Sequence, residues 1–427
     1  MKILTPLFLT GFCLLVLSGL SPDAVTPAAD EKVAPIREDW SDWRGPRRDG
    51  ISRETGLMLD WRASKPRRLW QRDLPVGYSS MTVVGDRLFT MGAEADAEYI
   101  YCLGTGDGGT LWKVHSGTTF KNSYGNGPRG TPVIDGNRVY ALGASGDLLC
   151  LARDSGKVLW QKNIIKDFGG KNIRWGVSTT PLVDGKKLVV HVGAKTASIV
   201  AFDKTNGKVI WKSHDDVAGY SAPIRVDLPG PDGKVPHLVV YCGRSLVGLS
   251  PSDGRVHWRH EWLTTDNMNI ATPIFEPRTR TLYVSASRNT GRCAAYRLTA
   301  AAGTVASKPL YTNKEMKNHY NSCVLLDGFL YGFDNSVLKC QELATGKVRW
   351  SNRSVGKGAV ISAQGHLFVL GEKGEMAVVE AKPEAYTEKG RFQALASKRA
   401  WTPPALAGGK LYVRDLERIT CIDISGK

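Results

Sequence analysis

Residues 130–160 read GTPVIDGNRVYALGASGDLLCLARDSGKVLW, and the pattern of this stretch decides the fold. An alternating apolar run ends at Asp135-Gly136, a dipeptide that suits a two-residue hairpin turn because it tolerates a positive φ. A second apolar run covers residues 138–143, and a third covers residues 148–153. A polar turn then leads into a fourth run, which ends at Trp160. The stretch therefore predicts four short antiparallel strands joined by tight turns.

Both phrases of this unit recur along the chain. The closing phrase reads DSGKVLW, TNGKVIW, SDGRVHW and ATGKVRW, and GDGGTLW is a looser copy. The opening phrase has copies that begin at residues 79, 130, 179, 221, 271, 321, 358 and 402. Units of about 45 residues with four strands are typical of the blades of a β-propeller. A single four-stranded sheet cannot bury both of its faces, so neighbouring blades must stack on one another.

The number of units favours eight blades. The eighth unit begins at Thr402 and has no closing strand after it, whereas residues 67–70 (RRLW) resemble that strand. We therefore expect an all-β, eight-bladed β-propeller of four-stranded antiparallel blades, closed by pairing of the N-terminal strand with the C-terminal strands. Seven blades are the alternative. We expect a structural packing role for the repeat tryptophans, which are Trp70, Trp112, Trp160, Trp211, Trp258 and Trp350.

The composition excludes several classes of protein. The 427 residues include 46 Gly and 12 Trp, and 42% of them are hydrophobic, which excludes a disordered or collagen-like chain. Only one long apolar run is present, which excludes a polytopic membrane protein. The formal net charge of +16 is explained either by solubility alone or by attraction to a polyanion.

The N-terminus resembles a cleaved export signal. Lys2 precedes an apolar stretch over residues 7–20, and small residues follow it. Cys13 lies inside the apolar stretch, so we expect no lipid anchor and a periplasmic or extracellular protein. The expected division of the chain is a signal peptide at 1–29, an N-terminal extension with the WSDWRGP segment at 30–65, and the propeller at 66–427.

The seven cysteines after the signal are expected to be mostly free, buried thiols. Their odd number cannot pair completely, and Cys102, Cys150, Cys340 and Cys421 fall at equivalent points of the repeat. The sequence contains no CxxC or CxxCH motif. We therefore predict neither a zinc ribbon nor covalently attached haem, and we single out no metal ligands.

The repeated phrases resemble those of bacterial PQQ-like (pyrroloquinoline-quinone-like) β-propellers. The resemblance covers about residues 66–427, and residues 40–52 (WSDWRGPRRDGIS) resemble the segment before the propeller in secreted planctomycete-type proteins. Two relatives are the outer-membrane assembly protein BamB, a non-enzymatic scaffold, and the quinoprotein dehydrogenases, which hold PQQ and calcium in the axial funnel. The repeats specify the fold more strongly than the function, because their Trp and Gly residues pack between blades.

A site is expected where the chain enters each innermost strand, because these segments converge on the central funnel. One interpretation is that their side chains plug the channel and satisfy the strand ends. The other is a pocket for an anionic or flat ligand, in which two arginines hold the anion and two tryptophans stack on a ring. The candidate ligand-binding residues are Tyr78, Arg129, Arg174, Trp175, Tyr220, Asn269, His319, Tyr320, Lys357 and Trp401.

The resemblance to quinoprotein dehydrogenases implies carboxylate ligands for calcium, a carboxylate base and a pair of adjacent cysteines. The funnel-entry segments contain no Asp or Glu, and no two cysteines are adjacent. We therefore predict no catalytic residues and no resident cofactor, and PQQ enters only through the resemblance.

The predicted function is a non-catalytic binding or assembly scaffold of the cell envelope, similar to BamB. The alternatives are a PQQ-dependent oxidoreductase and a carbohydrate-binding protein. The expected partner is an envelope protein or an anionic small molecule or glycan. We expect no nucleic acid partner, no transmembrane span in the mature chain, and a monomer.

Overall fold

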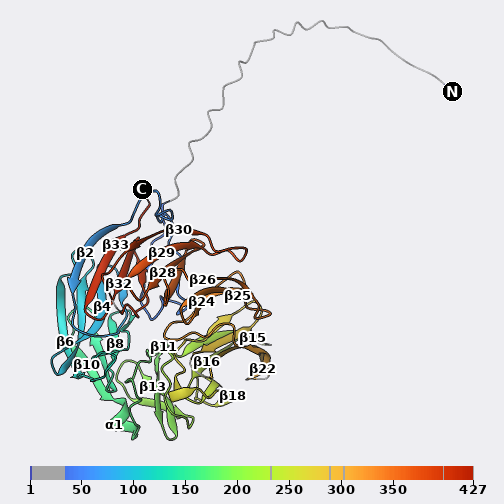
Figure 1. Ribbon diagram of the computed structural model, residues 1–427. Helices are drawn as coiled ribbons and strands as arrows, with labels where there is room; N and C mark the ends of the chain where they lie inside the picture. The colour runs from blue at the N-terminus through green and yellow to red at the C-terminus, as the bar shows by residue number, and fades with distance from the viewer. Residues whose placement is uncertain (2–33, 231–232, 288–289, 302, 398, 427) are drawn as a thin grey trace. The chain divides into compact units, whose positions relative to one another are not determined.

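Eight sheets, each with four antiparallel strands, stand around a common axis, and one of them carries β1 as a fifth, parallel strand (Figure 1). The computed structural model describes Met1 and residues 34–426, apart from 231–232, 288–289, 302 and 398, so the predicted signal peptide lies outside the described residues. Pro35–Lys427 form one unit. The prediction of an eight-bladed propeller is confirmed, and the seven-bladed alternative is wrong.

Each blade runs from a short innermost strand to an outermost strand at the rim. Blade one contains β3 (Thr82–Val84), β4 (Arg87–Glu94), β5 (Ala97–Gly104) and β6 (Thr110–Thr118), and blade two contains β7 (Val133–Asp135), β8 (Arg138–Leu142), β9 (Asp147–Ala152) and β10 (Val158–Asn163). Blade three contains β11 (Leu182–Asp184), β12 (Lys187–Ala194), β13 (Ala197–Asp203) and β14 (Val209–Ser213), and blade four contains β15 (Ile224–Gly230), β16 (Gly233–Tyr241), β17 (Ser245–Leu249) and β18 (Val256–Glu261).

The remaining blades repeat this order, with one exception at the end of the chain. Blade five contains β19 (Ile274–Glu276), β20 (Thr281–Ala286), β21 (Arg292–Ala301) and β22 (Thr304–Asn313). Blade six contains β23 (Val324–Leu326), β24 (Phe329–Asp334), β25 (Val337–Glu342) and β26 (Val348–Asn352), and blade seven contains β27 (Gly358–Ala363), β28 (His366–Gly371), β29 (Glu375–Glu380) and β30 (Glu388–Gln393). Blade eight combines β31 (Ala405–Ala407), β32 (Lys410–Arg414) and β33 (Arg418–Asp423) with β2 (Arg67–Asp73). The helical segments of the described chain are α1 (Ile164–Phe168) and η1 (Thr265–Asn267).

The ring closes as the sequence predicts. β2 pairs antiparallel with β33, and Trp70 lies opposite Cys421 in this register. The N-terminal strand therefore supplies the outermost strand that the eighth unit lacks. All seven described cysteines are buried and free, which confirms the expectation of unpaired thiols.

The hairpin between β7 and β8 shows how a repeat unit turns. The pairing reaches Asp135↔Arg138, so Gly136 and Asn137 form the two-residue turn, one position later than the Asp-Gly dipeptide itself. Gly136 has a φ of +58°, a left-handed conformation that glycine adopts without steric cost.

Five of the six repeat tryptophans donate an indole hydrogen bond to the next blade, and Trp258, whose nitrogen has no partner among the described residues, is the exception. The indole nitrogen of Trp112 donates to the carbonyl of Arg153 at 3.0 Å, and that of Trp160 donates to Lys204 at 3.2 Å. A glycine in the next blade lies against each ring, and a Cβ on Gly156 would come within 2.9 Å of the Trp112 ring. The closing phrase thus supplies a glycine that packs against the tryptophan of the preceding blade and a tryptophan that packs against the glycine of the following blade.

Residues 40–54, here called the axial segment, lie inside the ring and contact all eight blades. The backbone of Trp40 pairs with Val83 of β3, and the carbonyl of Ser41 accepts from Ile134 of β7 at 2.9 Å. β1 (Ile51–Ser52) pairs in parallel with β27 of blade seven. Glu54 accepts hydrogen bonds from the backbone of blade eight, just after β31.

The four remaining blades are held by side chains of the axial segment. Arg48 donates to the carbonyl of Pro181 in blade three and to that of Pro223 in blade four, the latter at 2.8 Å. The Trp43 indole donates to a threonine of blade five, and Arg44 donates to a carbonyl of blade six. Asp42 lies 2.9 Å from Arg48 and balances its charge. The axial segment therefore closes one end of the central channel.

Replacing Gly156 with alanine is expected to destabilise the ring more than replacing Gly136. The two residues have φ values of +72° and +58°, so the backbone strain of an alanine is similar at both. Only the Cβ at Gly156 would meet a tryptophan ring, since nothing lies within 4 Å of a Cβ at Gly136. Gly156→Ala should lower the free energy of unfolding by about 2 kcal/mol more than Gly136→Ala, measured by urea denaturation. Equal losses would contradict the inter-blade contact.

Candidate functional site

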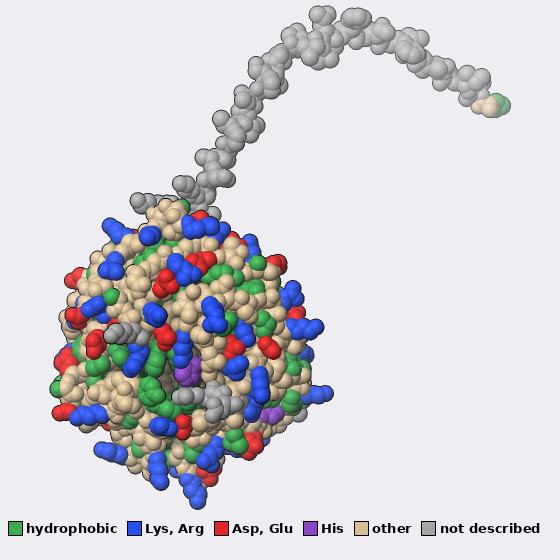
Figure 2. All heavy atoms as spheres, viewed as in Figure 1, with side chains coloured by type: hydrophobic (Ala, Val, Ile, Leu, Met, Phe, Trp, Pro, Cys, Tyr) green, Lys and Arg blue, Asp and Glu red, His purple; other side chains and the backbone are tan. Residues whose placement is uncertain are grey.

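A cavity of about 190 Å³ lies in the central channel on the side where the chain enters the innermost strands. Figure 2 shows the centre of this face hollowed, with hydrophobic, cationic and histidine side chains around the hollow. The indole of Trp43 closes the inner end of the cavity. The other lining residues are Tyr78, Tyr124, Arg129, Trp175, Ser178, Thr180, Tyr220, Ala222, Met268, Ile270, Thr272, His319, Tyr320, Trp401 and Pro403.

Seven of the ten candidate residues line this cavity, because equal positions in the repeat bring them to one end of the channel. Lys357 lies beside it, with its ammonium 4.8 Å from the centre of the Tyr320 ring. Arg174 lies over Trp175 but pairs with Asp266 at 3.1 Å. The seven lining residues are Tyr78, Arg129, Trp175, Tyr220, His319, Tyr320 and Trp401.

Asn269 has a different role. Its side chain is buried and donates to the carbonyls of Cys242, Gly243 and Trp262 at 2.7, 3.1 and 3.3 Å. The amide therefore holds the segment before β19 against blade four. This arrangement gives Asn269 a structural task and leaves the cavity to its neighbours.

Two aromatic groups form opposite walls of the cavity. Trp401 stacks on Tyr78 and on Tyr320, with ring centres 5.5 and 5.1 Å apart and interplanar angles of 17° and 25°. On the other side, Trp175 and Tyr220 lie 5.8 Å apart. The walls are thus flat and apolar, but the rings already stack on one another, so Trp401 is partly covered before any ligand arrives.

Two phenols of the cavity lack well-aligned hydrogen-bond partners. The hydroxyl oxygens of Tyr220 and Tyr320 are shielded from solvent, and neither meets a partner with good hydrogen-bond geometry among the described residues, although the backbone of Trp175 lies near the Tyr220 hydroxyl. Burial raises the pKa of Tyr220 to about 12 and raises that of Tyr320 further. Both groups therefore remain protonated near neutral pH and present O–H donors to the cavity. A buried polar group without a partner costs about 1–3 kcal/mol, which a ligand or an ordered water relieves.

The guanidinium of Arg129 binds the rim of the cavity itself. It donates to the carbonyls of Trp175 at 2.8 Å and Gly125 at 2.6 Å, and also to Gly127. Burial lowers its pKa to about 10, so it stays charged near neutral pH. Arg129 therefore contributes positive potential to the cavity, while its N–H groups hold the rim loops together.

Further side chains around the rim come from residues outside the set of candidates that the repeat pattern predicts. Arg399 stacks over Trp401 at 5.2 Å, and the Trp401 indole donates to Glu372 at 3.1 Å. Tyr124 and Trp43 add two more aromatic rings to the lining. Trp43 stands in the non-repeating WSDWRGP segment, whose position in the ring no repeat pattern reveals.

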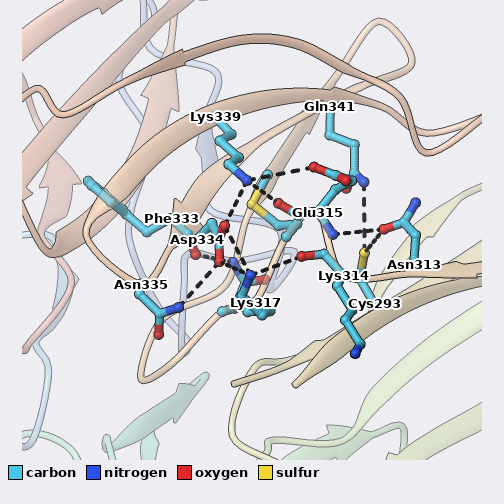
Figure 3. Close-up of polar contacts among 12 residues, drawn as sticks. Cys293, Asn313, Lys314, Glu315, Lys317, Phe333, Asp334, Asn335, Lys339 and Gln341 are labelled. Carbon is cyan, nitrogen blue, oxygen red and sulfur yellow. Dashed lines mark hydrogen bonds and ion pairs between the residues drawn. The ribbon is translucent and has the colours of Figure 1, made fainter. Parts of the chain in front are cut away.

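A polar network beneath the rim neutralises two lysines (Figure 3). Asp334, at the end of β24, lies 3.2 Å from Lys317 and 2.7 Å from Lys339. Lys317 also lines a shallow pocket shared with His319 and Lys357. Because Glu315 also lies 3.9 Å from Lys339, two carboxylates face the two lysines, and the network adds little net positive potential to the rim.

The cavity suits PQQ better than it suits calcium. Flat aromatic walls, two O–H donors and nearby cations fit a planar anionic molecule. Calcium takes oxygen ligands, with carboxylates prominent among them, and no Asp or Glu is present in the described lining of the cavity. Glu372 and Asp266 lie at the rim, where Trp401 and Arg174 bind them.

A family model described as outer membrane protein assembly factor BamB matches residues 96–352, which is more than half of the chain. No curated protein matches the chain.

Solved structures with the same fold include both scaffolds and enzymes. BamB from Moraxella catarrhalis is 13% identical, with a TM-score of 0.59 over 84% of this chain and 98% of that protein. A europium-containing methanol dehydrogenase is 13% identical, with a TM-score of 0.51 over 88% and 89%. The quinohemoprotein alcohol dehydrogenase ADHIIG from Pseudomonas putida HK5 is 11% identical, with a TM-score of 0.53 over 91% and 80%. At such identities these likenesses show the fold alone. Together with the family match, they place the chain in the outer membrane protein assembly factor BamB family of PQQ-like β-propellers.

Proposed function

We propose that this protein is a non-catalytic binding scaffold of the cell envelope whose central cavity holds a small, flat or anionic ligand. The observation that carries the proposal is the pair of buried phenols that line one cavity, of which Tyr320 has no hydrogen-bond partner among the described residues and Tyr220 has only the nearby backbone of Trp175. Two O–H donors in an apolar cavity select a molecule that offers oxygen acceptors.

The charges near the cavity favour an anion over a neutral acceptor. Lys357 and Arg399 stand over the rings of the aromatic wall, and Arg129 adds a third cation at the rim. Cations next to a low-dielectric cavity attract an anion more strongly than they would in bulk water. A planar ring system that carries a carboxylate would match the aromatic walls, the O–H donors and the nearby cations.

The absence of carboxylates from the described cavity lining supports a binding role over an oxidoreductase. Alcohol oxidation on a quinone needs a group that accepts the hydroxyl proton, and calcium at the quinone needs oxygen ligands. The proposed location in the envelope is supported by the signal-like N-terminus and by the family match. None of the described helices has the length and apolar character that a membrane crossing requires.

A titration with PQQ tests the proposal. We expect saturable quenching of tryptophan fluorescence at one PQQ per chain, with and without calcium, and no dye-linked oxidation of alcohols. Tyr320→Phe should weaken the binding about tenfold, because a hydrogen bond to a charged group contributes about 1.5–3 kcal/mol. Tyr99→Phe, on β5 and outside the cavity lining, is the matched control and should bind like the unmodified protein.

Two results would contradict this proposal. Calcium-dependent oxidation of an alcohol would make the protein an oxidoreductase. Failure to bind PQQ, together with failure to bind citrate and acidic oligosaccharides, would show that the aromatic residues serve only to fill the channel.

Arg129 and Arg174 are expected to differ in their effect on stability. Arg129 donates to three partly buried carbonyls, whereas Arg174 is an exposed partner of Asp266. Arg129→Ala leaves those carbonyls without donors and should lower the free energy of unfolding by about 2–3 kcal/mol. Arg174→Ala should leave it within about 0.5 kcal/mol. Urea denaturation of the two variants gives the comparison, and equal small losses would mean that Arg129 is available to a ligand.

A further inference from the structure

A buried group of metal-ligating side chains lies between blades three and four, apart from the central cavity. His214 and Asp216 follow β14, and Cys242 follows β16. His191 lies on β12, in the same blade as β14. We propose that these four residues form a zinc-binding site.

Three of the ligand atoms already lie close together. The candidate atoms of His214, Asp216 and Cys242 are all within 4.8 Å of one another. Neighbouring ligand atoms of a tetrahedral zinc site are about 3.5 Å apart. The three side chains therefore need to approach one another by only about 1 Å to bind one ion. No other cluster of three such residues is present in the part of the chain that the structure describes.

An independent observation comes from His191. Its side chain is 2% exposed, and neither ring nitrogen meets a partner with good hydrogen-bond geometry among the described residues, although the backbone of Val217 lies near the ring. His191 is not one of the three residues whose ligand atoms lie within 4.8 Å of one another, so its side chain must move toward them to become the fourth ligand. A buried imidazole without a well-aligned partner is costly, and a coordinated cation would satisfy one of its nitrogens.

The remaining contacts suit a second layer around a metal. The hydroxyl of Ser245 donates to the Oδ2 atom of Asp216, and it lies 3.4 Å from the Nε2 atom of His214. Hydrogen bonds of this kind orient carboxylate and imidazole ligands in metal sites. The hydroxyl of Ser198, also fully buried, has no partner in the described structure.

The chemistry of the ligand set selects the ion. Two imidazoles, one carboxylate and one thiolate match the ligands that Zn²⁺ accepts in four-coordinate sites. Binding would release the proton of the Cys242 thiol to solvent, since the thiolate is the ligand. A surface pocket lined by Gly193, Val217 and Ala218 opens beside the cluster and offers an entry path.

Cobalt substitution tests the site directly. The full chain is stripped with EDTA and titrated with Co²⁺, and its absorption spectrum is recorded. The expected result is one Co²⁺ per chain with a thiolate-to-cobalt charge-transfer band in the near ultraviolet and tetrahedral bands in the visible. Zn²⁺ should then displace Co²⁺ and abolish these bands at one equivalent.

Variants separate this site from unspecific metal binding. Cys242→Ser should remove the charge-transfer band, whereas Cys150→Ser, at another buried free thiol, should retain it. Ser245→Ala should weaken Zn²⁺ binding about tenfold or more. A stripped protein that binds no Co²⁺, or binds it without a thiolate band, would overturn the proposal, and this readout does not depend on the folding of any variant. The central cavity has a different lining, so failure of the zinc site leaves the PQQ titration unaffected.

Discussion

The guanidinium of Arg48 connects two blades and one carboxylate at the centre of the ring, and the architecture depends on the segment that carries it. Arg48 binds the carbonyls of Pro181 and Pro223, and its charge is balanced by Asp42. These carbonyls precede innermost strands that have no partner on their axial side. A propeller built from stacked blades leaves a column of such backbone groups around its axis, and buried polar groups require partners. Residues 40–54 supply partners to the backbone of seven blades and to the Thr272 side chain of blade five.

The axial segment also defines the cavity. Trp43 lines the cavity together with the aromatic residues of the repeats, and its indole donates to Thr272 of blade five. Burial in this lining raises the pKa of both cavity phenols above its ordinary value, so they stay protonated over a wider pH range than an exposed tyrosine. The proposed ligand site is thus built from two independent sources, namely the repeats and one non-repeating segment.

The sequence predicts those features that follow from periodicity. The phase of the repeat brings Tyr78, Tyr320 and Trp401 to one end of the channel, and the missing last strand of the eighth unit correctly predicts the pairing of β2 with β33. Features that depend on the path of single loops are not predictable in this way. The binding of Arg129 to its own rim follows from loop geometry, and the cluster around Cys242 unites residues from two blades without any short motif.

The most direct test of the axial segment compares Arg48→Met with Arg47→Met by urea denaturation. Arg48 is buried, whereas its neighbour Arg47 is a partly exposed partner of Glu38. Removing Arg48 leaves Asp42 without its buried partner and two blades without a shared donor, so the free energy of unfolding should fall by about 3 kcal/mol. The loss for Arg47→Met should be about 1 kcal/mol or less. Equal and small losses for the two variants would contradict the claim that the axial segment holds the blades together.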